Sequence, residues 1–426
     1  MQVLSKIKGE LAEGRVFLQF GILAAFGQGL GMLTPLIIAK FLTPALMGNY
    51  YLTKTAVFFF TTQLLYYMQT PFVVFANQEK EKSGKINKSF SVLCAFYAFS
   101  LTVFLLLIVS GSKKITDFAK IPPADIFIVI AAFAGIAMKT FICDLFLALG
   151  QRMKNALAEF VFGSVILICI ITLCLTGSVN LKTVFSVYFV AGLLVLIVFI
   201  KGVDFRLLTP FLFDRQQFRD TIAFAKWVFI GATASYFISW GNDNIVLRFN
   251  TSTSNIGTYN LGCDIYRSIL MLIFLIYIYF LPFVSQHIQD RTKIHEYLWR
   301  KRPRIFFVGL AVISLIFIFA PFAFRIVYQN VYEGSAAVLR ILLIAAALAL
   351  YNIFYEVVFN SLKKYKVTQT VNVLHVLLNL ILNIVLVPIM GIKGTAVATV
   401  ISYAARVVIY ETYFRTKIKP GLHLSN

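Results

Sequence analysis

The sequence is short of charge, and most of all of acidic charge. Of its 426 residues only 13% are Asp, Glu, Lys or Arg, whereas 59% are hydrophobic and the mean hydropathy is +0.83. Soluble chains carry about a quarter charged residues. A chain with so few charges must place most of its surface against lipid or other apolar helices, which excludes a soluble enzyme.

Cysteine and histidine are also scarce, with 5 and 4 residues. The cysteines have no metal-ligand spacing and lie in or beside apolar runs, so we interpret them as buried apolar side chains. No nucleophile–base pair is visible, and no loop is long enough to form a catalytic or nucleic-acid-binding domain. We therefore expect no enzyme activity, no cofactor, no metal and no nucleic-acid partner.

Instead, the sequence contains a series of apolar runs, each long enough to cross a bilayer as a helix. We predict an all-α polytopic membrane protein with about 12 transmembrane helices. The expected spans are 16–39, 46–76, 89–110, 124–150, 156–176, 179–201, 220–248, 257–284, 305–327, 336–362, 369–390 and 394–414.

Lys and Arg are unevenly divided between the two sets of loops. With a cytoplasmic N-terminus, the inside segments hold about three times as many of them as the outside loops. This predicts that both termini are cytoplasmic, and it attributes the net charge of +21 to loops lying against anionic lipid. The cluster "WRKRPR" at 299–304 has the same interpretation, a membrane-surface anchor, with a docking site as the alternative.

One short motif, which we call a corner, occurs twice in the sequence. "KFLTPALMGNYYL" begins at Lys40 and "RFNTSTSNIGTYNL" at Arg248, and both end in Gly-x-Tyr-x-Leu, at 48–52 and 257–261. We expect a turn that each half of the protein needs, with Gly at its tight position and Tyr at interfacial depth. The alternative is chance similarity of two generic membrane turns.

A second match supports an internal repeat. Asp144 and Glu356 each stand eight residues before a pair of basic residues, at nearly the same offset as the two corners. We therefore predict an N-terminal six-helix bundle (1–201), a cytoplasmic connecting segment (202–219) and a C-terminal six-helix bundle (220–426). Two parallel repeats of six spans would be related by a pseudo-two-fold axis along the membrane normal, with a cavity that opens to alternate sides.

Three segments resemble lipid-linked polysaccharide exporters of the O-antigen flippase type. "NLILNIVLVPIMGIKGTAVATVISY" has Asn383, Pro388 and Gly391 in the expected order, "IIAKFLTPALMGNYYL" is similar to the family's first corner, and "NDNIVLRF" places Asp243 in an acidic position. The resemblance runs over nearly the whole chain. The family is one branch of the multidrug, oligosaccharidyl-lipid and polysaccharide exporter superfamily.

This resemblance implies a flippase for undecaprenyl-diphosphate-linked oligosaccharides in the bacterial inner membrane, where a polysaccharide polymerase and a chain-length regulator would be further partners. A proton- or sodium-coupled drug or metabolite antiporter of the same superfamily is the alternative. A membrane polysaccharide polymerase or glycosyltransferase would need a sizeable loop outside the membrane, and the longest outside loop expected here is 111–123.

Charged groups at membrane depth are costly and are candidates for function. The deepest cations are expected to bind the diphosphate, because Arg forks and Lys ammonium groups are its natural partners. They are Lys54, Lys139, Arg267 and Arg406. The alternative for Arg267 is a pair with Asp264, three residues earlier on the same helix.

The deep carboxylates are expected to couple transport to an ion gradient, with hydrogen bonding between helices as the alternative. They are Asp144, Glu356, Asp243 and Asp264. A polar stripe on the span 369–390 predicts contacts to sugar or to neighbouring helices. It comprises Asn372, His375, Asn379 and Asn383, of which Asn379 and Asn383 are assigned to the substrate.

Overall fold

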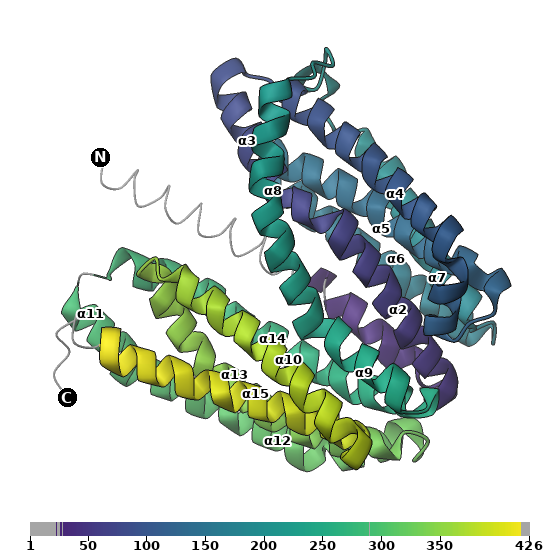
Figure 1. The fold of residues 1–426 in the computed structure, drawn as a ribbon, viewed down its shortest axis with the longest axis vertical. Coiled ribbons are helices and arrows are strands. Elements are labelled where there is room, and N and C mark those ends of the chain that lie inside the picture. Colours follow the sequence, from purple (N-terminus) through teal and green to yellow (C-terminus); the bar gives the residue numbers. More distant parts are fainter. Residues whose placement is uncertain (1–22, 24–25, 28, 289, 419–426) are drawn as a thin grey trace. The chain divides into compact units, whose positions relative to one another are not determined.

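The computed structural model describes residues 23, 26–27, 29–288 and 290–418 (Figure 1). These residues form helices joined by turns, and none of the described residues is in a strand. Ten of the described helical stretches are long and apolar enough to cross a membrane. The prediction of an all-α polytopic membrane protein is therefore confirmed.

The described chain clusters into two compact units. Unit 1 takes in 52–236, and unit 2 takes in 43–51 together with 237 onward. The helices up to the end of unit 1 are α2 (Pro44–Leu64), η1 (Tyr66–Met68), α3 (Gln69–Ser83), α4 (Asn87–Ala119), η2 (Pro123–Ile126), α5 (Phe127–Ala148), α6 (Arg152–Leu175), α7 (Leu181–Ile200), η3 (Phe205–Leu207) and α8 (Arg215–Tyr236). The domain boundaries expected from the sequence stay a prediction.

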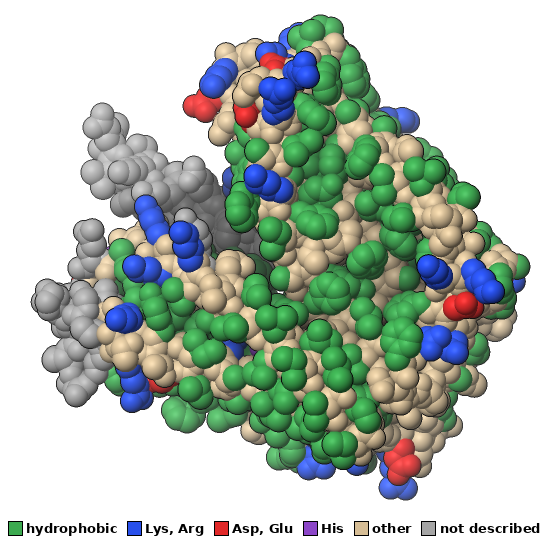
Figure 2. All heavy atoms as spheres, in the orientation of Figure 1, with side chains coloured by type: hydrophobic (Ala, Val, Ile, Leu, Met, Phe, Trp, Pro, Cys, Tyr) green, Lys and Arg blue, Asp and Glu red, His purple; other side chains and the backbone are tan. Residues whose placement is uncertain are grey.

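Unit 2 continues the chain with a short π-helical segment, η4 (Phe237–Gly241), where the sequence has a polar break. Its other helices are α9 (Asn242–Asn250), α10 (Thr253–Gln286), α11 (Arg291–Glu296), η5 (Tyr297–Lys301), α12 (Arg302–Tyr328), α13 (Glu333–Ser361), α14 (Tyr365–Met390), α15 (Ile392–Tyr413) and η6 (Phe414–Ile418). Lys and Arg gather toward the ends of the helices, and hydrophobic side chains cover their flanks, as expected for helices in lipid (Figure 2).

One expected span is not a single continuous helix. The span 46–76 is interrupted at η1, because Pro71 has no N–H and its ring would clash with the carbonyl group of Tyr67 in a continuous helix. The first part of the span 16–39 lies outside the described residues, and Gly29–Ile38 is helical.

The expected outside loop 111–123 is partly helical. Helix α4 runs on to Ala119, because no proline interrupts it before Pro122, and it ends at Lys120 in the left-handed conformation.

Small residues allow the helices of each unit to pack closely. In unit 1, a Cβ on Gly135 of α5 would overlap the carbonyl group of Tyr188 on α7, and a Cβ on Gly192 of α7 would overlap Gly135. In unit 2, Gly262 of α10 lies in the same way against Ser335 of α13. This is the usual way in which membrane helices associate, because lipid provides no hydrophobic force between them.

Candidate functional site

The two repeated corners lie against each other in unit 2. A Cβ on Gly48 of α2 would overlap the carbonyl oxygen of Thr253 on α10, and a Cβ on Gly257 would overlap the carbonyl oxygen of Pro44. The glycines therefore allow close approach of two helix starts, and neither has a positive φ. Both corner tyrosines, Tyr50 and Tyr259, are fully buried, and their interfacial depth stays a prediction.

A buried ion pair lies deeper along α10. Arg267, roughly 20 Å along the helix from Thr253, donates from Nη1 to Oδ1 of Asp264 at 2.8 Å. The side chains are only 11% and 5% exposed. The hydroxyl group of Tyr51 donates to the other carboxylate oxygen of Asp264 at 2.7 Å. The first corner thus contributes directly to the surroundings of this pair.

The guanidinium group of Arg267 has further partners in unit 2. Its Nε donates to the carbonyl oxygen of Ser239 at 3.1 Å, inside the π-helical segment. Its Cζ lies 3.8 Å from the ring centroid of Trp240, within the range of a cation–π contact. Its Nη2 lies 3.5 Å from Oδ1 of Asn260. The Nδ2 group of Asn260 in turn donates to Oδ1 of Asn244 at 2.6 Å. The local π-helix presents both a carbonyl group and an aromatic face to the arginine.

A second buried cluster joins α9, α10 and α14. Asp243 accepts hydrogen bonds from the hydroxyl group of Tyr259 at 2.6 Å and from Nδ2 of Asn383 at 3.0 Å. Asn383 also donates to Oδ1 of Asn379 at 3.0 Å, and Asn242 donates to the same oxygen at 3.0 Å. Asn379 and Asn383, both predicted to contact substrate, therefore contact each other and the predicted coupling residue Asp243.

Helices α13 and α15 bring together two residues to which the sequence assigned different roles. Arg406 forms an ion pair with Glu356 through Nη2, and it donates to the hydroxyl group of Tyr410 at 3.2 Å. Nearby, the ring of His375 on α14 packs edge-on against Tyr403 of α15, with centroids 4.7 Å apart. The sequence did not indicate this pair, because Glu356 and Arg406 lie on different helices.

Unit 1 holds a separate set of buried charges. Lys139 of α5 forms an ion pair with Glu159 of α6 at 2.8 Å. Asp144, one and a half turns further along α5, accepts hydrogen bonds from Gln69 at 2.8 Å and from Tyr97 at 3.1 Å. Lys54 of α2 is also buried, with Nζ 5.7 Å from the ring centroid of Phe58.

The predicted site residues thus fall into several groups. Unit 2 contains the Arg267–Asp264 pair, the Asp243–Asn383–Asn379 cluster and the Arg406–Glu356 pair, while Lys54, Lys139 and Asp144 lie in unit 1. Sequence reasoning missed the polar residues that complete these groups. They are Tyr51, Gln69, Tyr97, Glu159, Trp240, Asn242, Tyr259 and Asn260.

The model of a family described as "Polysaccharide biosynthesis protein" matches residues 20–288. Among curated proteins, the chain is similar to the "Probable low-salt glycan biosynthesis flippase Agl15" of Haloferax volcanii, with 24% identity over 197 residues. That alignment covers 46% of this chain and 42% of the relative, less than half of either.

Solved structures share the fold over nearly the whole chain. The "Lipid II flippase MurJ, inward closed conformation" has a TM-score of 0.77 at 14% identity, covering 94% of this chain and 88% of that one. An inward-facing multidrug resistance transporter of the MATE family in the MOP superfamily has a TM-score of 0.71 at 12% identity, covering 94% and 96%. At these identities the likeness shows the fold alone.

Proposed function

The chain belongs to the polysaccharide biosynthesis protein family, as the sequence resemblance predicted, and from that premise we propose that it is a flippase for lipid-linked oligosaccharides. The substrate in this proposal is a repeat unit on undecaprenyl diphosphate, moved from the cytoplasmic to the periplasmic leaflet of a bacterial inner membrane by alternating access. Both termini would be cytoplasmic. A polysaccharide polymerase and a chain-length regulator would use the product.

The observation that carries the proposal is the Arg267–Asp264 pair at membrane depth in unit 2. Taking two charges out of water costs several kcal/mol per ion, and their mutual attraction often only balances that cost. Apolar residues would serve a purely structural helix contact at least as well. A pair that is also held by Tyr51, Ser239 and Trp240 is therefore better explained by a role in binding.

In this proposal the diphosphate competes with Asp264 for Arg267. A guanidinium group forms parallel hydrogen bonds to phosphate oxygens as readily as to a carboxylate. Occupation of Asp264 by the coupling ion would release Arg267 for the substrate, and loss of that ion would restore the pair and expel the phosphate. The same exchange applies to Arg406 with Glu356 and, in unit 1, to Lys139 with Glu159.

The amide groups near Asp243 would serve the sugar. Asn379 and Asn383 are buried and already share hydrogen bonds with each other and with the carboxylate. Sugar hydroxyl groups both donate and accept, so they can replace such bonds one for one. Asp243 and Asp144 accept hydrogen bonds from neutral donors, and we propose that they take part in ion coupling. Lys54 would contribute positive charge for the diphosphate.

The test separates substrate binding from simple neutralisation of a buried acid. Arg267→Gln leaves Asp264 without its cation, which by itself costs about 3–5 kcal/mol. The double variant Arg267→Gln/Asp264→Asn removes both charges and so avoids that penalty. Each variant is expressed in cells deleted for the gene, with Lys82→Ala at an exposed position as control.

Lipid-linked sugars are then measured in inside-out vesicles, together with surface glycan. We expect both Arg267 variants to accumulate repeat units on the cytoplasmic leaflet, while the Lys82 control transports normally. If the double variant transports as well as the unmodified protein, Arg267 only neutralises Asp264 and the site assignment is wrong. Normal surface glycan with altered drug tolerance in the deletion strain would instead indicate the antiporter.

A further inference from the structure

The basic cluster at 299–304 turns one arginine inward in unit 2. Arg302, the first residue of α12, places its guanidinium carbon 4.6 Å from the ring centroid of Tyr351 and 4.3 Å from that of Tyr355. Its Nη2 donates to the hydroxyl group of Tyr355 at 2.9 Å. Among the described residues, no carboxylate lies within ion-pair distance of Arg302, so this cation is held by aromatic rings and a neutral hydroxyl group.

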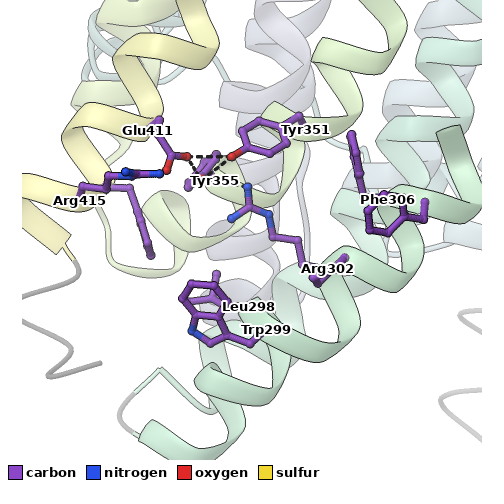
Figure 3. A pocket seen from close by; sticks show the side chains of 11 residues that line it. Leu298, Trp299, Arg302, Phe306, Tyr351, Tyr355, Glu411 and Arg415 are labelled. Carbon is purple, nitrogen blue, oxygen red and sulfur yellow. Dashed lines mark hydrogen bonds and ion pairs between the residues drawn. The ribbon is translucent and has the colours of Figure 1, made fainter. Parts of the chain in front are cut away.

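Arg302 lies at a pocket of about 500 Å³, a size typical of small-ligand sites (Figure 3). Glu411 also lines the pocket, and its carboxylate accepts hydrogen bonds from Tyr351 at 3.0 Å, from Arg415 and from Tyr355, whose hydroxyl group also binds Arg302. Glu411 is thus already neutralised by Arg415. The pocket keeps one uncompensated positive charge, that of Arg302, and therefore favours an anion.

The rim of the pocket is apolar and open. Trp299 is 54% exposed and Phe307 is 65% exposed, and both residues line the pocket. Tryptophan at the boundary of an apolar surface and a basic segment is typical of the lipid–water interface. This end of unit 2 also carries Arg300, Lys301 and Arg304, in a segment that the sequence places on the cytoplasmic side. A soluble anion would make no use of the aromatic rim, whereas a lipid would use both parts.

We propose that this pocket binds the phosphate head group of a membrane lipid. The phosphate binds the guanidinium group of Arg302, which the two tyrosine rings hold in place, and the lipid chain runs past Trp299 and Phe307. A phosphodiester of a bulk anionic phospholipid and the phosphate of a polyprenyl carrier have this chemistry in common. The site is distinct from the buried groups around Arg267 and does not rest on the flippase proposal.

Quenching of Trp299 tests the proposal. The full chain is reconstituted in phosphatidylcholine vesicles that contain acyl-brominated phosphatidylglycerol or, at equal mole fraction, acyl-brominated phosphatidylcholine. The contribution of Trp299 is the difference between the protein and its Trp299→Phe variant. We expect the anionic lipid to quench Trp299 more strongly. Arg302→Gln should reduce that preference by about tenfold, as for a lost charge-assisted hydrogen bond, and Arg304→Gln, an exposed neighbour of equal charge, should keep it.

Competitors identify the source of the phosphate. Displacement of the brominated lipid by unlabelled phosphatidylglycerol indicates a bulk phospholipid site, and displacement by polyprenyl phosphate at lower mole fraction indicates the carrier lipid. Displacement by inorganic phosphate would overturn the proposal, because the site would then recognise a soluble anion. Equal quenching by both brominated lipids, or the same preference in Arg302→Gln, would also overturn it. If Arg302→Gln does not fold, Arg302→Lys keeps the charge without the planar fork and should lose part of the preference.

Discussion

The contact between the two corners gives a sharp prediction about stability. In Gly48→Ala the new Cβ meets the backbone carbonyl oxygen of Thr253. A backbone atom cannot rotate away as a flexible side chain can, so α2 and α10 must move apart. Overpacking of this kind costs about 1–3 kcal/mol, and the gain from replacing a helical Gly offsets only about 0.5–1 kcal/mol of it.

The same displacement reaches Asp264. Tyr51 lies three residues after Gly48 on α2, and it donates to Asp264 at 2.7 Å. If the helices separate, this hydrogen bond to a carboxylate lengthens or breaks, with a cost of about 1.5–3 kcal/mol. We therefore expect Gly48→Ala to lower the free energy of unfolding by roughly 1.5–5.5 kcal/mol in total.

The matched control is Gly111→Ala in α4, where the nearest neighbour of an added Cβ is Cδ1 of Ile115 on the same helix, at 3.9 Å. Unfolding in mixed micelles, followed by tryptophan fluorescence as the SDS mole fraction rises, measures both variants. The double variant Gly48→Ala/Gly257→Ala should lose less free energy of unfolding than the two single variants lose together, because one added methyl group already separates the helices. A Gly48→Ala protein as stable as Gly111→Ala would refute the reasoning.

Three further outcomes are expected. Lys88 holds the pKa of Asp214 below its ordinary value of 3.8 through a hydrogen bond of 2.9 Å. The wild-type protein should therefore have a higher thermal stability than Asp214→Asn at neutral pH. That difference in stability should vanish as the pH falls through the lowered pKa. Asn383→Leu removes one of the two donors to Asp243 and should lower the free energy of unfolding by about 1–3 kcal/mol in the same micelle assay. An unchanged free energy of unfolding would contradict the hydrogen bond between Asn383 and Asp243. Gly135→Ala should destabilise unit 1 by about 1–3 kcal/mol, because its Cβ overlaps the backbone of α7, and unchanged unfolding would show that α5 and α7 are not in close contact.

The helical fold could be predicted because lipid permits little else. A backbone in hydrocarbon must satisfy its own hydrogen bonds, so each long apolar run has to be a helix. The break before α3 was also open to prediction, since Pro71 cannot follow Tyr67 in an uninterrupted helix. The break is indicated only by Pro71, a single residue inside an apolar run that continues on both sides. A hydropathy average over that run does not detect it.

The site was predictable only along single helices. The spacing of Asp264 and Arg267 on one helix face indicated their pair. The partners of Glu356 and Lys139 come from other helices, α15 and α6. Which helices face each other depends on close packing at small residues, and a single sequence does not reveal that pairing.

The π-helical segment η4 has a mechanical consequence. The chain passes between the units in the turn before α2, from Leu42 to Thr43, then inside α2, from Tyr51 to Leu52, and again where α8 leads through Phe237–Gly241 into α9. The crossing inside α2 is an unbroken helix, which resists torsion, whereas the crossing at η4 is a widened helical turn that deforms more readily. Any rotation of one unit against the other would therefore be resisted by α2, and η4, the turn that holds Ser239 and Trp240 against Arg267, would take up part of it.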